Sequence, residues 1–255
     1  MDLKIEVIPA LTDNYIFVLV DPSTHRAVVI DPAENQQVQA FISNNNLQLT
    51  HILNTHHHYD HIGGNYSLKS QFGAKIIAPV YDRERIPHAD QLVAEGDSID
   101  ILSTSAHVLF IPGHTRGHIA YWFKKESLLF VGDTLFSLGC GRLFEGTPEQ
   151  MFTSLERIKQ LPPQTTVYCA HEYTQTNGHF AHQYEPNNLQ LQQRMSEVRQ
   201  LRAQSRPTVP TMLHIELATN PFLRPHSHEI RQNLNMPQAS ELEVFTRLRQ
   251  LKDEF

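Results

Sequence analysis

The sequence has few of the features that mark secreted, membrane-spanning or nucleic-acid-binding proteins. Only two cysteines occur, Cys140 and Cys169, which are too few for a disulfide framework. No segment has the roughly 18 consecutive apolar residues that a membrane helix needs, and charges and a proline interrupt the start of the chain, where a signal peptide would be apolar. The formal net charge of −6 gives no general attraction to nucleic acid or to anionic membranes. We therefore expect a cytoplasmic protein with no nucleic-acid or membrane partner.

Histidine, by contrast, is present in unusual number. There are 16 histidines, against 21 lysines and arginines combined. Histidine is the commonest metal ligand in proteins, so the positions of these side chains bear directly on whether the chain holds a metal. Hydrophobic residues make up 40% and charged residues 19% of the 255 residues. This composition suits one large globular domain, or a larger and a smaller one.

Short apolar or β-branched runs alternate with turn signals in the first two thirds of the chain. We expect helices at 38–44, 63–72 and 149–160, and strands at 16–20, 27–30, 51–54, 75–78, 108–111, 119–123, 127–131 and 167–169. After residue 172 the pattern becomes polar and helical, with helices expected at 189–205 and 239–252. These patterns predict a layered α/β domain over residues 1–171 and a smaller helical domain over residues 172–255.

The densest group of possible metal ligands follows directly on the expected strand at 51–54. His56 and His58 are two positions apart, so in extended backbone their side chains point to one side. Asp60 and His61 follow at once and could face a second position. Four possible ligands in so short a loop are more than one tetrahedral ion can use. The cluster therefore predicts a metal site, and its additional ligands could bind a second ion.

Three further candidates follow other expected strands, each after one or two small residues: His114, Asp133 and His171. Small residues let the backbone approach closely and let the next side chain turn inward. A lone histidine after a strand is more often hydrogen-bonded or solvated than a metal ligand. Burying several imidazoles and carboxylates without a cation, however, would be very costly. We therefore interpret the whole group as a metal centre, and expect His57 and Tyr59 to have packing or supporting roles.

The same residues resemble the signature of the metallo-β-lactamase superfamily, Thr-His-x-His-x-Asp-His, which is matched at 55–61. The resemblance continues at 31–32, 112–118, 132–133 and 170–171. It implies an αββα sandwich with the site at one edge and two divalent metal ions, with zinc as the first expectation and iron or manganese as alternatives. The implied ligands are His56, His58 and His114 for the first metal, Asp60, His61 and His171 for the second, and Asp133 as the bridge between them.

Four later segments, at 140–147, 171–174, 220–224 and 249–253, resemble the glyoxalase II (hydroxyacylglutathione hydrolase) family within that superfamily. The resemblance implies hydrolysis of S-D-lactoylglutathione to glutathione and D-lactate, the second step of methylglyoxal detoxification. Basic and phenolic side chains would then bind the carboxylates and amides of glutathione. Phe144 stands where some family members have tyrosine, so a hydroxyl contact would be missing. The implied substrate-binding residues are Arg142, Phe144, Tyr173, Arg249 and Lys252.

The implied mechanism uses a hydroxide shared by two metal ions, with Asp60 and Asp133 as the catalytic carboxylates. A glutathione thiolate can leave without prior protonation, because its solution pKa is about 8.5. Alternatives are a β-lactamase, an RNA-processing nuclease, a one-iron persulfide dioxygenase and a non-catalytic metal-binding protein. The acidic charge disfavours the nuclease, and the complete second ligand set favours a two-metal hydrolase over the dioxygenase. We expect the enzyme to be a monomer.

Overall fold

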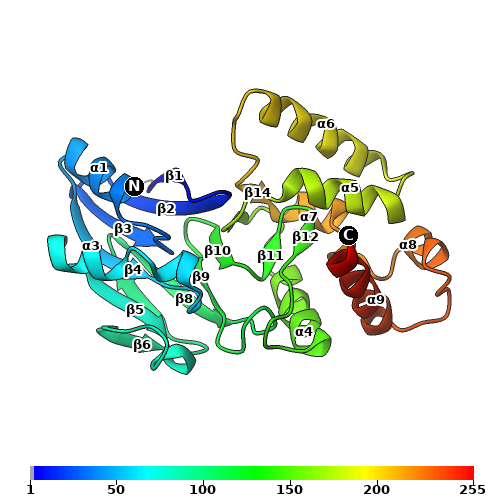
Figure 1. Cartoon of the computed structure of the whole chain (residues 1–255), viewed down its shortest axis with the longest axis horizontal. Helices are drawn as coiled ribbons and strands as arrows, with labels where there is room; N and C mark the ends of the chain where they lie inside the picture. Colours follow the sequence, from blue (N-terminus) through cyan, green and yellow to red (C-terminus); the bar gives the residue numbers. More distant parts are fainter. Residues whose placement is uncertain (1–2) are drawn as a thin grey trace. The chain divides into compact units, whose positions relative to one another are not determined.

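The computed structural model describes residues 3–255, which divide into two compact units (Figure 1). The first unit runs to Phe110 and resumes over Gly117–Gly132, and the second comprises Ile111–Arg116 and Asp133–Phe255. This division follows spatial contacts and not one point in the chain, so the domain boundary at residue 172 stays a prediction. Among the described residues, no helix has both the length and the apolar character needed to span a bilayer.

Six strands of the first unit form a mixed sheet in the order β1-β2-β3-β4-β5-β6 (Figure 1). The pairs β1–β2 and β2–β3 are antiparallel, and the pairs from β3 to β6 are parallel. The helices α1 and α3 connect parallel strands, and Val38 and Leu68 pack from them against Val18 and Val29 of the sheet. The elements are β1 (Lys4–Ala10), β2 (Asn14–Asp21), β3 (Arg26–Ile30), α1 (Gln36–Asn44), β4 (Gln48–Leu53), α2 (Tyr59–Ile62), α3 (Asn65–Phe72), β5 (Lys75–Pro79), η1 (Val80–Asp82) and β6 (Gln91–Val93).

Four further strands of the first unit pair antiparallel in the order β10-β9-β8-β7. Phe130 of β10 meets Phe17 of β2 with ring centroids 5.5 Å apart. Successive residues of a strand point to opposite faces, so Phe17 lies on the face opposite Val18 and the helices. This strand group therefore covers the second face of the mixed sheet. Its strands are β7 (Ser98–Ile101), β8 (Thr104–Phe110), β9 (Ile119–Phe123) and β10 (Leu128–Gly132).

The second unit is mainly helical. Capping boxes at Thr147 and Ser240 fix the starts of α4 and α9, because the cap side chain and the third helical residue satisfy each other's backbone donors. Phe222 packs against Phe180 and Phe245, with ring centroids 6.0 and 5.9 Å away. The elements are β11 (Leu135–Phe136), β12 (Gly139–Cys140), α4 (Pro148–Lys159), β13 (Thr166–Cys169), α5 (Thr174–Tyr184), α6 (Leu189–Ala203), β14 (Thr211–Met212), α7 (Leu213–Thr219), η2 (Pro221–Leu223), α8 (His228–Asn233) and α9 (Glu241–Glu254).

The expected α/β class with a helical C-terminal region is confirmed, and each predicted strand and helix corresponds to an observed one. The predicted end of α3 is also confirmed, since Gly73 follows Phe72 in the left-handed conformation with φ of 69°.

Candidate metal centre

Two neighbouring parallel strands, β3 and β4, end at the same edge of the mixed sheet, and Asp31 and Thr55 follow them. The Asp31 carboxylate accepts hydrogen bonds from the Thr55 backbone nitrogen at 2.8 Å and from its hydroxyl at 2.6 Å. Gly132, at the end of β10, lies against the Thr55 side chain, and a Cβ at this position would be 2.4 Å from Thr55 Oγ1. The φ of Gly132 is +48°. A glycine is therefore required where the strand-end pattern predicts a close backbone approach.

Asp31 also orients the imidazole of His61, which lies on the short helix α2. The His61 Nδ1 is 3.0 Å from Asp31 Oδ2, and its Nε2 is 3.6 Å from Asp60 Oδ2. A histidine that donates one ring N–H to a carboxylate offers its other nitrogen as a ligand in a fixed direction. Asp31 was not among the predicted ligands, although it follows a strand as the predicted ligands do.

His56 and His58 lie beside His61. The ring centroids of His56 and His58 are 4.7 Å apart, and those of His56 and His61 are 4.1 Å apart. Possible ligand atoms of Asp31, His56 and His61 all lie within 4.8 Å of one another. The first unit therefore brings the four ligands predicted after β4 together at one edge of the sheet.

The second unit contains a corresponding group of His114, Asp133 and His171, all of them buried. Oδ2 of Asp133 lies 3.3 Å from His114 Nε2 and 3.4 Å from His171 Nε2. The His114 Nδ1 is 2.8 Å from the Arg142 carbonyl oxygen, so this nitrogen carries the proton and Nε2 is left to face Asp133. Two imidazole nitrogens thus converge on one carboxylate oxygen.

These side chains fit divalent metal ions. Imidazole nitrogen and carboxylate oxygen are good ligands for zinc, iron and manganese, and crowding them in a buried place without a cation is costly. Neither cysteine offers a thiolate, because burial raises the pKa of Cys169 to about 12 and also raises the pKa of Cys140. Both thiols are free and buried, so the two cysteines form no disulfide framework and pack as small core residues.

His57 and Tyr59, which lie between the predicted ligands in sequence, have other surroundings. The His57 Nδ1 is 3.3 Å from Asp82 Oδ2, and its Nε2 is 3.2 Å from the Arg85 guanidinium. Tyr59 is 78% exposed. The contact with Asp82 fits the supporting role expected for His57, whereas the exposure of Tyr59 does not fit the expected packing role.

Three of the predicted substrate-binding residues lie at the surface of the second unit. The Arg142 side chain is 56% exposed, and its backbone carbonyl contacts His114. Phe144 is 62% exposed and meets the His114 ring edge-on, with centroids 5.2 Å apart. Tyr173 stacks on His171 with centroids 4.9 Å apart. All three therefore border predicted metal ligands of the same unit.

Arg249 and Lys252 of α9 have different environments. Arg249 is buried, and its Nη1 donates to the Cys140 carbonyl oxygen at 2.8 Å. Asp253 accepts from Arg249 Nη2 at 3.1 Å and from Arg142 Nε at 3.2 Å, a role that the sequence did not suggest. The Lys252 ammonium lies over two phenylalanine rings, and burial lowers its pKa. Arg249 thus holds backbone beside Arg142, while Lys252 is a partly desolvated cation.

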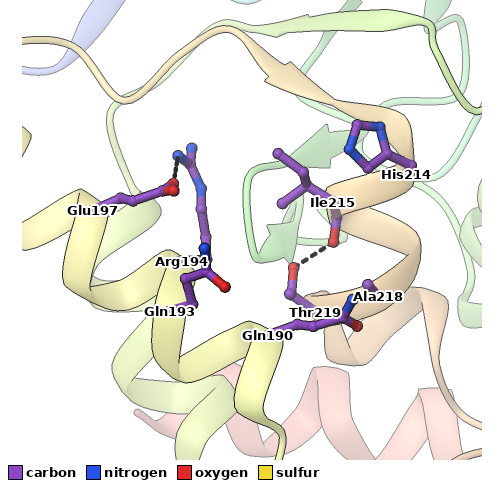
Figure 2. Close-up of a pocket in the computed structure, with 8 residues that line it drawn as sticks. All are labelled: Gln190, Gln193, Arg194, Glu197, His214, Ile215, Ala218 and Thr219. Carbon is purple, nitrogen blue, oxygen red and sulfur yellow. Dashed lines mark hydrogen bonds and ion pairs between the residues drawn. The ribbon is translucent and has the colours of Figure 1, made fainter.

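A separate pocket of about 260 Å³ opens between α6 and α7 of the second unit (Figure 2). Arg194 and Glu197 form an ion pair on the α6 side at 3.3 Å, and the Thr219 hydroxyl donates to the Ile215 carbonyl oxygen on the α7 side (Figure 2). No residue predicted to bind metal or substrate lines this pocket.

Comparison with known families agrees with the motifs along the whole chain. Residues 12–171 match the model of the metallo-β-lactamase superfamily, and residues 172–255 match that of the hydroxyacylglutathione hydrolase C-terminus. The hydroxyacylglutathione hydrolase of Methylococcus capsulatus is 49% identical over 99% of both chains. That of a Synechococcus species is 48% identical over 99% of this chain and 100% of its own.

Solved structures show the same fold at lower identity. The B3 metallo-β-lactamase BLEG-1 has a TM-score of 0.68 at 23% identity and covers 87% of this chain and 100% of its own. ETHE1 from Myxococcus xanthus has a TM-score of 0.67 at 24% identity and covers 99% of this chain and 98% of its own. The chain therefore belongs to the hydroxyacylglutathione hydrolase family, within the metallo-β-lactamase superfamily.

Proposed function

We propose that this chain hydrolyses the thioester of S-D-lactoylglutathione to glutathione and D-lactate, the second step of methylglyoxal detoxification. The observation that carries the proposal is the 48–49% identity to hydroxyacylglutathione hydrolases over almost the full length of the chain. The match to their C-terminal family model over 172–255 supports the same substrate, because this region contains Tyr173, Arg249 and Lys252.

The proposed metal ligands are His56, His58 and His114 for one ion, Asp60, His61 and His171 for the other, and Asp133 for both. When bound, the ions supply an activated water at neutral pH and polarise the thioester carbonyl. Zinc is our first choice, and the same imidazole and carboxylate ligands suit iron or manganese. The chain itself fixes the ligand directions, since Asp31 orients His61 and the Arg142 carbonyl orients His114.

The substrate is proposed to bind by its peptide end. Glutathione carries two carboxylates and two amides, and Arg142 and Lys252 offer cations for the carboxylates. The ammonium of Lys252 is partly withdrawn from water, which strengthens its attraction to an anion. Tyr173 offers a hydroxyl to an amide, and Phe144 offers an apolar surface beside His114. Arg249, being buried, would act on substrate mainly through the backbone that it holds.

The test is to incubate the metal-replete protein with S-D-lactoylglutathione and follow the loss of thioester absorbance. We expect rapid turnover that a chelator abolishes, and zinc, iron and manganese added back singly will rank the metals. No turnover by the metal-replete protein would contradict the proposal. Oxygen uptake with glutathione persulfide would then favour the dioxygenase alternative.

Replacing Lys252 with methionine is expected to raise KM for the thioester about tenfold and to leave kcat within about twofold. Methionine keeps the apolar packing on the phenylalanine rings, and a lost charge-assisted hydrogen bond of about 1.4 kcal/mol corresponds to that factor. Steady-state kinetics at constant ionic strength measure the effect. Lys125→Met, at an exposed position, is the matched control and should change neither constant. An unchanged KM in the Lys252 variant would remove this residue from the binding site.

We also propose that the protein is a cytoplasmic monomer. Its two cysteines are free thiols, which is the usual state in a reducing compartment. Light scattering during gel filtration should give the mass of one chain, 29.3 kDa. A dimer mass would contradict the monomer.

A further inference from the structure

The segment from Asp133 to Arg142 joins a proposed metal ligand to a proposed substrate-binding residue, and the hairpin of β11 and β12 lies between them. Each strand of the hairpin has only two residues, with Leu135 opposite Cys140 and Phe136 opposite Gly139. So short a hairpin is not stable by itself. Other parts of the second unit must therefore hold this segment in place.

The carboxylate of Glu216, on α7, holds the turn of the hairpin. Glu216 is fully buried. One of its oxygens accepts from the Ser137 hydroxyl at 2.9 Å and from the Thr211 hydroxyl at 2.8 Å. The other accepts from the Leu138 backbone nitrogen at 2.8 Å and from the Asn220 side-chain amide at 3.0 Å. Leu138 has a φ of +60°, which is unfavourable for leucine, so this hydrogen bond stabilises a turn that the residue would not adopt alone.

Two asparagines hold the carbonyl groups of the same hairpin. The Asn220 amide nitrogen lies 3.0 Å from the Phe136 carbonyl oxygen and 2.9 Å from that of Gly139. The Asn177 amide donates to the Ser137 carbonyl oxygen at 3.1 Å. Buried backbone carbonyl groups that have no hydrogen bond from strand pairing therefore accept hydrogen bonds from side chains distant in sequence.

All four contacts of the Glu216 carboxylate that the structure shows are with neutral donors. Burying a carboxylate is costly unless hydrogen bonds fix it, and an apolar residue would fill the same space at lower cost. A network of this kind specifies one geometry for the atoms that it joins. Here those atoms belong to the segment between Asp133 and Arg142.

We propose that Glu216, assisted by Asn220, is a positioning residue for the active site. By fixing the hairpin it sets where Asp133 meets His114 and His171, and where Arg142 presents its side chain. The effect on substrate binding through Arg142 rests on the proposed thioester hydrolysis. The effect on metal retention through Asp133 does not depend on which substrate the protein uses.

The test compares Glu216→Leu with Glu216→Gln. Leucine removes all four acceptor contacts. A glutamine oxygen can still accept from Leu138 and Asn220, and its amide can donate to the hydroxyls of Ser137 and Thr211, which accept as readily as they donate. We expect the leucine variant to raise KM about tenfold and to lose metal to a competing chelator at about tenfold lower chelator concentration. The glutamine variant should stay within about threefold of the wild type in both measurements.

Glu185→Leu is the matched control for lost stability. Glu185 is equally buried in the second unit and accepts from Arg224, Ser227 and Asn188, none of which lies in the hairpin segment. We expect it to lower the melting temperature without changing KM or metal retention. Asn177→Ala is a milder second variant, in case Glu216→Leu does not fold, and should raise KM about threefold.

Two outcomes would overturn the positioning role. One is a leucine variant whose KM and metal retention match those of Glu185→Leu, and the other is a glutamine variant as impaired as the leucine variant. If the wild type itself does not cleave the thioester, the proposed function fails. Metal retention in the same variants then still decides whether Glu216 positions Asp133.

Discussion

Asp133→Asn is expected to lower kcat/KM for the thioester at least about 10³-fold, which corresponds to about 4 kcal/mol of lost transition-state stabilisation. The Asp133 carboxylate lies within 3.4 Å of the buried Nε2 atoms of His114 and His171, so its charge faces both of these proposed ligands. Asparagine keeps the shape and removes the charge, and its amide nitrogen would repel a cation. The variant should therefore lose both metal affinity and activity.

The measurement is steady-state kinetics together with the metal content of each preparation by elemental analysis. Asp100→Asn is the matched control, because it replaces aspartate with asparagine at an exposed position on β7. It should keep full metal content and activity. An Asp133→Asn protein that holds as much metal as the wild type and stays within tenfold of its kcat/KM would exclude Asp133 from the proposed ligand set.

Elements with strong apolar periodicity were predictable because their local pattern agrees with their burial. Helix α1 buries Val38 and Ile42, four residues apart, and β3 is buried along almost its whole length between neighbours on both sides. Strand β1 was not predicted. Lys4 and Glu6 alternate with Ile5 and Val7 as in a strand, but Pro9 argues against one. Its position at the edge of the sheet explains why a proline is tolerated there.

Helix α5 could not be predicted because its sequence is poor in helix-forming residues. It contains Thr174, Asn177 and Gly178, which have low helix propensity, and all three are buried. A Cβ on Gly178 would come 3.2 Å from both Leu138 and Met195, so the helix backbone packs closely on neighbouring elements. Tertiary packing therefore stabilises this helix against its local preference.

The candidate ligands were predictable because several chelating residues follow strand ends at short spacing, as His56 and His58 do. The residues that orient them were not, since each acts over a long separation in sequence. Asp31 meets His61 only because two parallel strands end side by side. Glu216 reaches the hairpin from a helix whose sequence gives no sign of this contact. Sequence spacing thus identifies groups that chelate, while the fold decides which groups support them.

Gly141→Ala is expected to lower kcat/KM about 100-fold and the free energy of unfolding by about 3 kcal/mol, although alanine adds only one methyl group. A Cβ on Gly141 would lie 1.9 Å from the Asp133 carbonyl oxygen and 3.2 Å from His114 Nδ1. The Gly141 nitrogen also donates to the Thr134 carbonyl oxygen at 3.2 Å, so the two backbone segments are held together at this point. No side chain can move aside to relieve the clash, and the Asp133 backbone has to shift.

A displacement of the Asp133 backbone by about 1 Å is enough to lower kcat/KM about 100-fold, because the proposed metal ligand Asp133 and the proposed substrate-binding residue Arg142 both belong to this segment. Urea unfolding and thioester kinetics measure the two effects. Gly96→Ala is the control that separates backbone strain from a steric clash. Gly96 has a φ of +83° and nothing within 4 Å of an added Cβ, so alanine adds backbone strain of about 1 kcal/mol and no clash. The control should lose stability and keep its activity. If Gly141→Ala retained kcat/KM within threefold of the wild type, the Asp133 backbone would not be the constraint that the close contact indicates.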